Sequence, residues 1–199
     1  MNFTLKSINT DTLPSACILI PVYEGGGLSA NGKAINKASK GFITRVLKSG
    51  DLTGKNEQTL LLHHVPGIKA NRVLLAGFGK QKEITPSSYQ KALIAALKAI
   101  KSTDSKDATL CVAEINVKGQ DGATNIKQAA QQLETLLYNF GQYKSKPKEL
   151  KLKKVTFVLT KSISTEHRQA AKSGKAIGVG VNFARALGDT PPNVCHPTY

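Results

Sequence analysis

The chain has 199 residues, of which 40% are hydrophobic and 21% charged, and its formal net charge at pH 7 is +15. This composition excludes a disordered chain, no apolar run approaches the length of a membrane span, and the first residues lack the basic-then-apolar order of a signal peptide. The three cysteines are scattered and odd in number, so we expect a reducing cytoplasm, no disulfide framework and no membrane partner.

The first third of the chain contains two segments typical of strands and one typical of a helix. Residues 3–8 alternate apolar and polar side chains, which predicts an edge strand. Residues 16–23 form a continuous apolar run that is too short for a helix and suits a strand buried on both faces. Residues 28–47 have helical apolar spacing, interrupted at Gly41.

The middle of the chain predicts a pair of strands followed by a helix. Residues 59–65 and 72–78 have strand character, and their short connection favours antiparallel neighbours. Thr85 followed by Pro86 is typical of a helix start. The helix after it carries one apolar face, made of Tyr89, Leu93, Ala96, Leu97 and Ile100.

The remaining elements continue the alternation. Residues 109–113 and 154–160 predict two more strands, and residues 165–187 a final helix. Strands and helices in this order, with one antiparallel pair, predict an α/β fold: a three-layer α/β/α domain with a mixed central sheet. Between these two strands, apolar residues at helical spacing predict another helix, which ends at Gly141. Its apolar residues are Ile126, Ala130, Leu133, Leu137 and Phe140. The final helix places Ala170, Gly174, Ile177, Val181 and Ala184 in register.

Two glycine-rich turns follow predicted strands. Gly77-Phe-Gly-Lys80 lacks the spacing and the hydroxyl residue of a phosphate-binding P-loop, and it indicates a tight strand exit. Residues 24–29 lie between a buried strand and a helix, where α/β folds bring backbone N–H groups close to a phosphate. Their Gly-Gly-Gly run is similar to the loop of ADP-ribose-binding macro domains, but Ile-Pro-Val-Tyr stands where those domains have Asn-Ala-Ala-Asn. A nucleotide pocket and a plain flexible loop both stay open.

The histidines and cysteines predict no metal or catalytic site. His63 and His64 are adjacent on a strand, so they point to opposite faces, and we expect one packed inside and the other outside. We therefore assign no catalytic, metal-binding or cofactor-binding residue. The other candidates show neither ligand spacing nor a nucleophile–base arrangement; they are His167, His196, Cys17, Cys111 and Cys195.

The positive charge suggests a candidate nucleic-acid surface. A field of this sign favours polyanions, although acidic residues elsewhere in a longer chain would balance it. The dense lysine cluster lacks interleaved arginines, and Tyr143 is its one aromatic neighbour, so a solvated loop is the alternative. The cluster consists of Lys144, Lys146, Lys148, Lys151, Lys153 and Lys154.

Small residues recur in the final helix. Ala170, Gly174 and Gly178 lie four residues apart, with Gly180 close by, and this spacing lets another backbone approach closely. We interpret the stripe as the face of a helix clamped between two domains, and expect part of it to be exposed. Packing on its own sheet is the alternative.

The end of the chain carries the most specific motif. A helix ending in Ala-Arg-Ala-Leu-Gly runs into Asp-Thr-Pro-Pro-Asn-Val-Cys-His-Pro-Thr-Tyr. This segment closely resembles the one that opens the catalytic domain of the leucyl (cytosol) aminopeptidases, and residues 73–80 are similar to a strand end in their N-terminal domain. The resemblance implies a macro-like N-terminal domain at 1–161, an interdomain linker helix at 162–188 and the start of a catalytic domain, cut short, at 189–199.

The resemblance also implies an activity for the whole protein. The family consists of cytoplasmic, hexameric metallopeptidases, hydrolases that release N-terminal residues, preferably leucine, from peptides with two divalent ions, manganese or zinc. Their metal-binding and catalytic motifs lie in the C-terminal domain and match no position here. The chain alone is therefore expected to be non-catalytic and to aid assembly with its own catalytic domain and other subunits. Two alternatives stay open: a DNA-binding module of a moonlighting member, or a macro-like nucleotide-binding domain.

Overall fold

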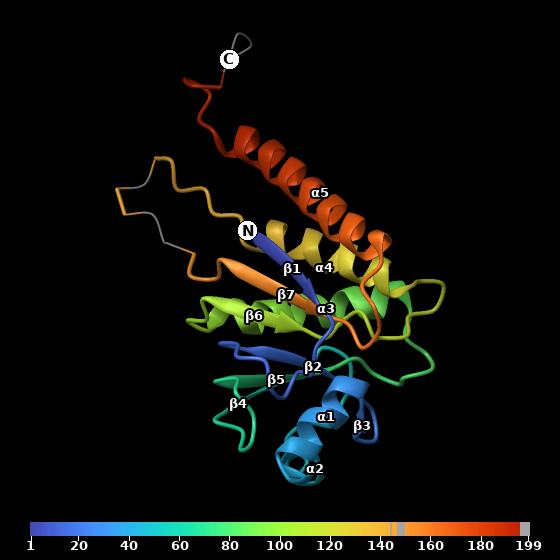
Figure 1. The fold of residues 1–199 in the computed structure, drawn as a ribbon. Helices are drawn as coiled ribbons and strands as arrows, with labels where there is room; N and C mark the ends of the chain where they lie inside the picture. The colour runs from blue at the N-terminus through green and yellow to red at the C-terminus, as the bar shows by residue number, and fades with distance from the viewer. Residues whose placement is uncertain (144, 147–149, 196–199) are drawn as a thin grey trace.

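The structure is a computed structural model that describes residues 1–143, 145–146 and 150–195, and it contains one sheet with helices on both faces (Figure 1). The strands are β1 (Asn2–Lys6), β2 (Ile18–Tyr23), β3 (Gly27–Leu28), β4 (Thr59–His63), β5 (Arg72–Gly77), β6 (Asp107–Leu110) and β7 (Lys154–Val158). The helices are α1 (Ala30–Ala38), α2 (Phe42–Lys48), α3 (Pro86–Ser102), α4 (Gly122–Leu136) and α5 (Thr165–Asp189).

The sheet is mixed, as predicted. Its strand order is β1-β7-β6-β2-β5-β4, and β3 pairs with β2 off this path. The pairs from β1 to β5 are parallel, whereas β4 is antiparallel to β5. The predicted antiparallel neighbours and the predicted edge strand are both confirmed. The α/β three-layer architecture is confirmed as well, while its macro-like character stays a prediction.

Strand β2 divides two hydrophobic cores. Leu19 and Tyr23 belong to the core that also holds the buried faces of α3 and α4. Ile18, Ile20 and Val22 belong to the other core, which contains residues from α1 and α2. Each fully buried side chain of this size stabilises the fold by about 1.5–3 kcal/mol. The continuous apolar run is therefore explained by burial on both faces, because neither side of this strand contacts water.

Nearby residues set some helix boundaries, either by capping a helix end or by breaking the helical backbone. The Thr85 hydroxyl accepts a hydrogen bond from the Ser88 N–H at 3.2 Å, and Pro86 occupies the first turn of α3. Gly41, with a φ of 78°, separates α1 from α2, which explains why the helical pattern predicted for residues 28–47 forms two helices.

The predicted bounds of α4 and β6 are wrong. Helix α4 ends at Leu136 and does not extend to Gly141. Side chains satisfy its last carbonyls: Arg185 donates to the Thr135 oxygen and Lys101 to the Leu136 oxygen. Strand β6 begins at Asp107, two residues earlier than expected, and ends at Leu110. The Asp107 carboxylate accepts hydrogen bonds from the segment before β2, which holds the start of β6 in the sheet.

Within the described ranges, no helix combines the length and the hydropathy that crossing a bilayer requires.

The three thiols should differ sharply in reactivity. Burial raises the pKa of Cys17 to about 11 and raises that of Cys111 well above its usual value, whereas Cys195 is partly exposed. Since the thiolate is the nucleophile, an aromatic disulfide reagent at pH 8 should modify Cys195 quickly and the other two only after unfolding in guanidinium. A Cys195→Ser variant should lose the fast phase, and two or more fast thiols in the unchanged protein would contradict the burial.

Candidate functional site on helix α5

The described histidines do not form a metal or catalytic centre. His63 and His64 are both exposed, so the prediction that one of them packs inside is wrong. The reason is backbone geometry: β4 ends at His63, and His64 has a φ of 52°, which ends the strand alternation. His167 is structural, because its Nδ1 lies 2.8 Å from the Ser164 hydroxyl in the capping box that starts α5. His196 lies outside the described residues.

The donor set does not fit a two-metal centre. In the described part of the chain there is no group of three or more His, Cys, Asp or Glu residues that could hold an ion. Bridging two divalent ions needs several converging carboxylates or imidazoles. The chemistry implied for the family therefore has no counterpart among these residues.

The glycine-rich loop forms a tight turn, and the helix that follows it contacts an internal carboxylate. Gly25 and Gly26 both have a φ of 79° and join β2 to β3. At the N-terminus of α1 the Glu114 carboxylate accepts a hydrogen bond from the Asn31 N–H at 3.1 Å. The positive end of α1 is thus already occupied by an internal carboxylate, and a phosphate placed there would meet a like charge.

The second glycine turn is a strand exit, as predicted. A β-carbon at Gly77 would overlap the backbone oxygen of Lys55. The Gly79 N–H donates to the Gly54 oxygen at 2.9 Å, with Gly79 at a φ of 76°. Close approach of two backbones explains Gly77 and the positive φ explains Gly79, without any ligand.

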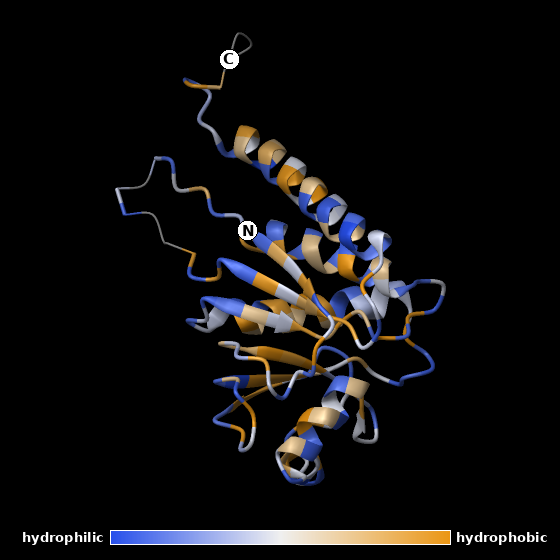
Figure 2. Ribbon diagram, in the orientation of Figure 1, coloured by the Kyte–Doolittle hydropathy of each residue, from blue (hydrophilic) through white to orange (hydrophobic). Residues whose placement is uncertain are grey.

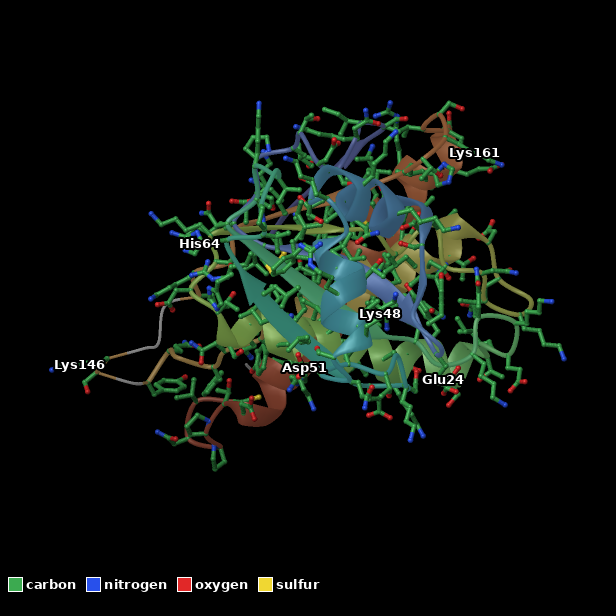
Figure 3. The ribbon with its side chains drawn as sticks, turned by 90° about the horizontal axis from the view of Figure 1, so that it is seen from below. Glu24, Lys48, Asp51, His64, Lys146 and Lys161 are labelled. Carbon is green, nitrogen blue, oxygen red and sulfur yellow. The ribbon has the colours of Figure 1, made fainter. Side chains whose placement is uncertain are left out.

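The lysine cluster is only partly described. Lys151 forms an exposed ion pair with Asp104 at 2.8 Å, while Lys146, Lys153 and Lys154 are also exposed. Lys144 and Lys148 lie outside the described residues. Figure 3 shows Lys146 and Lys161 on opposite sides of the molecule. The assignment of these lysines to nucleic acid stays a prediction.

Helix α5 packs tightly along α4, and glycines make this possible. Ala171, Gly174 and Gly178 are buried, and a β-carbon at Gly174 would overlap the Lys127 backbone oxygen. A β-carbon at Gly178 would come within 3.0 Å of the Gln131 oxygen. We call this contact the α4–α5 seam. The small-residue spacing therefore does mark a close helix approach, and the partner in this structure is α4 of the same domain.

Polar contacts hold the second half of the seam. Asn182 donates to the Glu134 oxygen at 2.8 Å, and Arg185 donates to the Thr135 oxygen at 2.9 Å. The Arg185 guanidinium lies 4.5 Å from the centre of the Tyr138 ring. We call the side chains of Asn182 and Arg185 the C-terminal clasp, because they satisfy carbonyls at the end of α4 and fix the direction of α5.

The second half of α5 is largely exposed. Ile177 and Val181 were expected on the stripe with Gly174, but they are 40% and 38% exposed. Since the helix turns by about 100° per residue, Val181 lies on the same side as Gly174, but no residue of α5 after Gly178 is buried. Asn182 of the clasp is half-buried and Arg185 is exposed. The expected exposure of the small residues holds for Gly180, whose missing side chain faces open space, but not for Gly174 or Gly178.

The second half of α5 exposes large apolar side chains, which is unusual for a surface helix. Phe183 is 66% exposed. Figure 2 shows apolar residues along this half of the helix, which lies beyond α4 as the outermost element (Figure 1). An apolar patch of this kind marks an interaction surface. These side chains surround the second half of α5, where no residue after Gly178 is buried. We call this exposed apolar surface the outer face of α5; its large side chains are Ile177, Val179, Val181, Phe183 and Leu187.

Comparison with known proteins gives one consistent result. Residues 19–147 match the cytosol aminopeptidase family, N-terminal domain. The chain is 42% identical over 200 residues to a cytosol aminopeptidase of Pseudomonas aeruginosa, covering 100% of this chain and 40% of that relative. It therefore spans two fifths of the length of this relative.

Solved structures show the same fold. A mutant of tomato leucine aminopeptidase superposes with a TM-score of 0.79 at 18% identity, covering 100% of this chain and 40% of that chain. The bottromycin maturation enzyme BotP in complex with Mn superposes with a TM-score of 0.66 at 19% identity, covering 92% of this chain and 34% of that chain.

A matched pair of substitutions in α5 tests the seam. Gly174→Ala should lower the free energy of unfolding by about 1–3 kcal/mol, because the added methyl group overlaps the α4 backbone. Gly180→Ala should raise it by about 0.5–1 kcal/mol, because the site is open and alanine favours the helix. Urea denaturation of both variants measures the difference, and effects of the same sign would contradict the packing described here.

Proposed function

The chain belongs to the cytosol aminopeptidase family as its N-terminal domain, and on that premise we propose that it is a non-catalytic scaffold whose helix α5 holds the catalytic domain. The observation that carries this proposal is the outer face of α5. A helix whose first half is buried in the seam and whose second half exposes large apolar side chains is suited to further burial by a second domain. The relatives continue for well over half of their length beyond the matched region, and that further part is the occupant we propose for the outer face.

The seam supports the same role. A helix that positions a second domain needs a defined direction, because an error in its angle grows with distance along the helix. The buried glycines bring α5 close to α4 over its first half, and the C-terminal clasp holds its second half. The contacts between α5 and α4 therefore fix the direction in which the chain continues after Asp189.

We further propose the division that the family implies: a domain at 1–161, a linker helix at 162–188 and the start of the catalytic domain at 189–199. The whole protein would release N-terminal residues from peptides, with leucine preferred, in the cytoplasm. Two manganese or zinc ions would sit in the catalytic domain, and the subunits would form a hexamer that this domain helps to assemble.

The other two candidate functions have weaker support. A nucleotide at the glycine-rich loop would compete with the Glu114 carboxylate for the N-terminus of α1. For DNA, Lys151 is already paired with Asp104, and exposed lysines occur on opposite sides of the molecule. We therefore place the function of this chain in assembly of the peptidase.

A charged residue on the outer face should disrupt the longer protein and leave this chain intact. Phe183→Asp should leave the free energy of unfolding of the 199-residue chain within about 0.5 kcal/mol of the unchanged chain, because the side chain is exposed. In the protein extended by the catalytic domain, the same change should lower peptidase activity and hydrogen-exchange protection of residues 177–187. Activity assays and hydrogen exchange on both lengths measure this.

A matched control uses another exposed apolar residue. Ile8 is 44% exposed and lies outside α5, so Ile8→Asp should have little effect at either length. If Phe183→Asp behaves like Ile8→Asp in the longer protein, or if residues 177–187 exchange equally fast at both lengths, the outer face does not contact the catalytic domain.

The 199-residue chain by itself should not hydrolyse peptides. Incubated with leucine p-nitroanilide and manganese, it should give no turnover above a blank, because its described residues provide no group that could hold metal. Turnover that persists after repurification and scales with the amount of this chain would overturn the scaffold proposal.

A further inference from the structure

A second surface, separate from the outer face of α5, lies at the β1 edge of the sheet. A groove with a volume of about 610 Å³ runs between β1 and the first half of α5. Strand β1 contributes one wall and pairs only on its other side, with β7. The groove is lined by Asn2, Phe3, Thr4, Leu5, Arg168, Ala171, Lys172 and Lys175.

The backbone of β1 presents unpaired hydrogen-bonding groups to this groove. Asn2 donates its N–H to the Lys153 oxygen at 3.1 Å, and the Lys6 oxygen accepts from the Leu159 N–H at 3.0 Å. In a parallel ladder alternate residues bond to the same neighbour, so the even-numbered residues of β1 face β7. The N–H and C=O groups of Phe3 and Leu5 therefore point to the open edge, where a further strand can bind them.

The opposite wall of the groove is positively charged. Arg168, Lys172 and Lys175 lie on one side of α5 at helical spacing, and none of the described lining residues is acidic. Lys175 also donates to the Met1 oxygen at 2.8 Å, which places its ammonium group beside the start of β1. Glu166, in the first turn of α5, is two residues from Arg168 and therefore lies about 200° away around the helix.

The groove also has an apolar floor. Phe3 and Leu5 are partly buried and pack against the main core, and the ring centres of Phe3 and Phe157 are 5.7 Å apart. Side chains alternate between the two faces of a strand, so an extended segment that adds to β1 would direct every second side chain into the groove. Acidic residues at those positions would meet the cations of α5, and the residues between them would lie on the other face of the sheet.

We propose that this groove binds an extended acidic peptide segment, which adds to the sheet as a strand beside β1. Main-chain hydrogen bonds to Phe3 and Leu5 give the register, and the three cations of α5 select acidic side chains. A second copy of this chain is a poorer occupant, because pairing two β1 edges would bring two sets of these cations together. The proposal does not depend on the catalytic domain or on the outer face of α5.

Titration with a designed peptide tests the proposal on the 199-residue chain. The probe is an eight-residue peptide of alternating glutamate and valine with blocked ends. Its binding is measured in solution from the amide chemical shifts of the protein. Binding should shift the amides of Phe3, Leu5 and Lys172. Lys172→Glu should weaken it at least about tenfold, because it reverses a charge in the groove. Lys48→Glu, in α2 under the opposite face of the sheet, should change the affinity less than twofold.

Two further peptides separate strand addition from simple charge attraction. A version N-methylated at every second residue keeps its charge but loses half of its donors, so it should bind at least about tenfold more weakly. A version with lysine in place of glutamate should not bind. Equal binding of the methylated peptide, no binding of the acidic one, or a concentration-dependent dimer that protects the β1 amides from exchange would each overturn the proposal.

Discussion

The close approach of α5 to α4 is the contact on which the functional surfaces of this domain depend. Two helix backbones come this near only where side chains are absent, and Gly174 and Gly178 supply those positions. Once that face is buried, the rotation of α5 about its axis is set. The cations of the groove then face β1 along the first half of the helix, and the outer face is exposed along the second half. A single helix thus serves three contacts.

Charge and apolar surface are divided along α5 in a way that suits different partners. The first half carries Arg168, Lys172 and Lys175 beside an open strand edge, whereas the second half carries exposed large hydrophobic residues. Desolvating lysine is costly, but an apolar helix face gains from burial. The second half is therefore suited to a permanent domain contact, and the first half to a charged segment that binds in water. The net charge of +15 fits this division without requiring nucleic acid.

An internal side chain occupies the helix N-terminus at which other α/β proteins bind a phosphate. A glycine turn after a buried parallel strand, followed by a helix, is an arrangement that binds phosphates in other α/β proteins. Here Glu114 binds the N-terminus of α1, and Asn31 beside it is buried. The burial of Tyr23 and the negative charge of Glu114 together raise the pKa of that phenol to about 12. An internal carboxylate thus performs the electrostatic role that a bound anion would have, and the loop becomes structural.

Local chemistry in the sequence determined which elements form. The capping pair at Thr85 and Pro86, the apolar run of β2 and the order of strands and helices were all readable, because each depends on neighbours within a few residues. The terminal motif also identified the family. Only the tertiary structure decided which sides of α5 are buried, because glycine spacing shows that a backbone approaches but not which one. The same holds for the end of α4, where Arg185 binds a carbonyl 50 residues away in the chain, and for the open edge of β1, which exists only once the sheet is assembled. Such contacts join residues far apart in the sequence, so no local pattern encodes them.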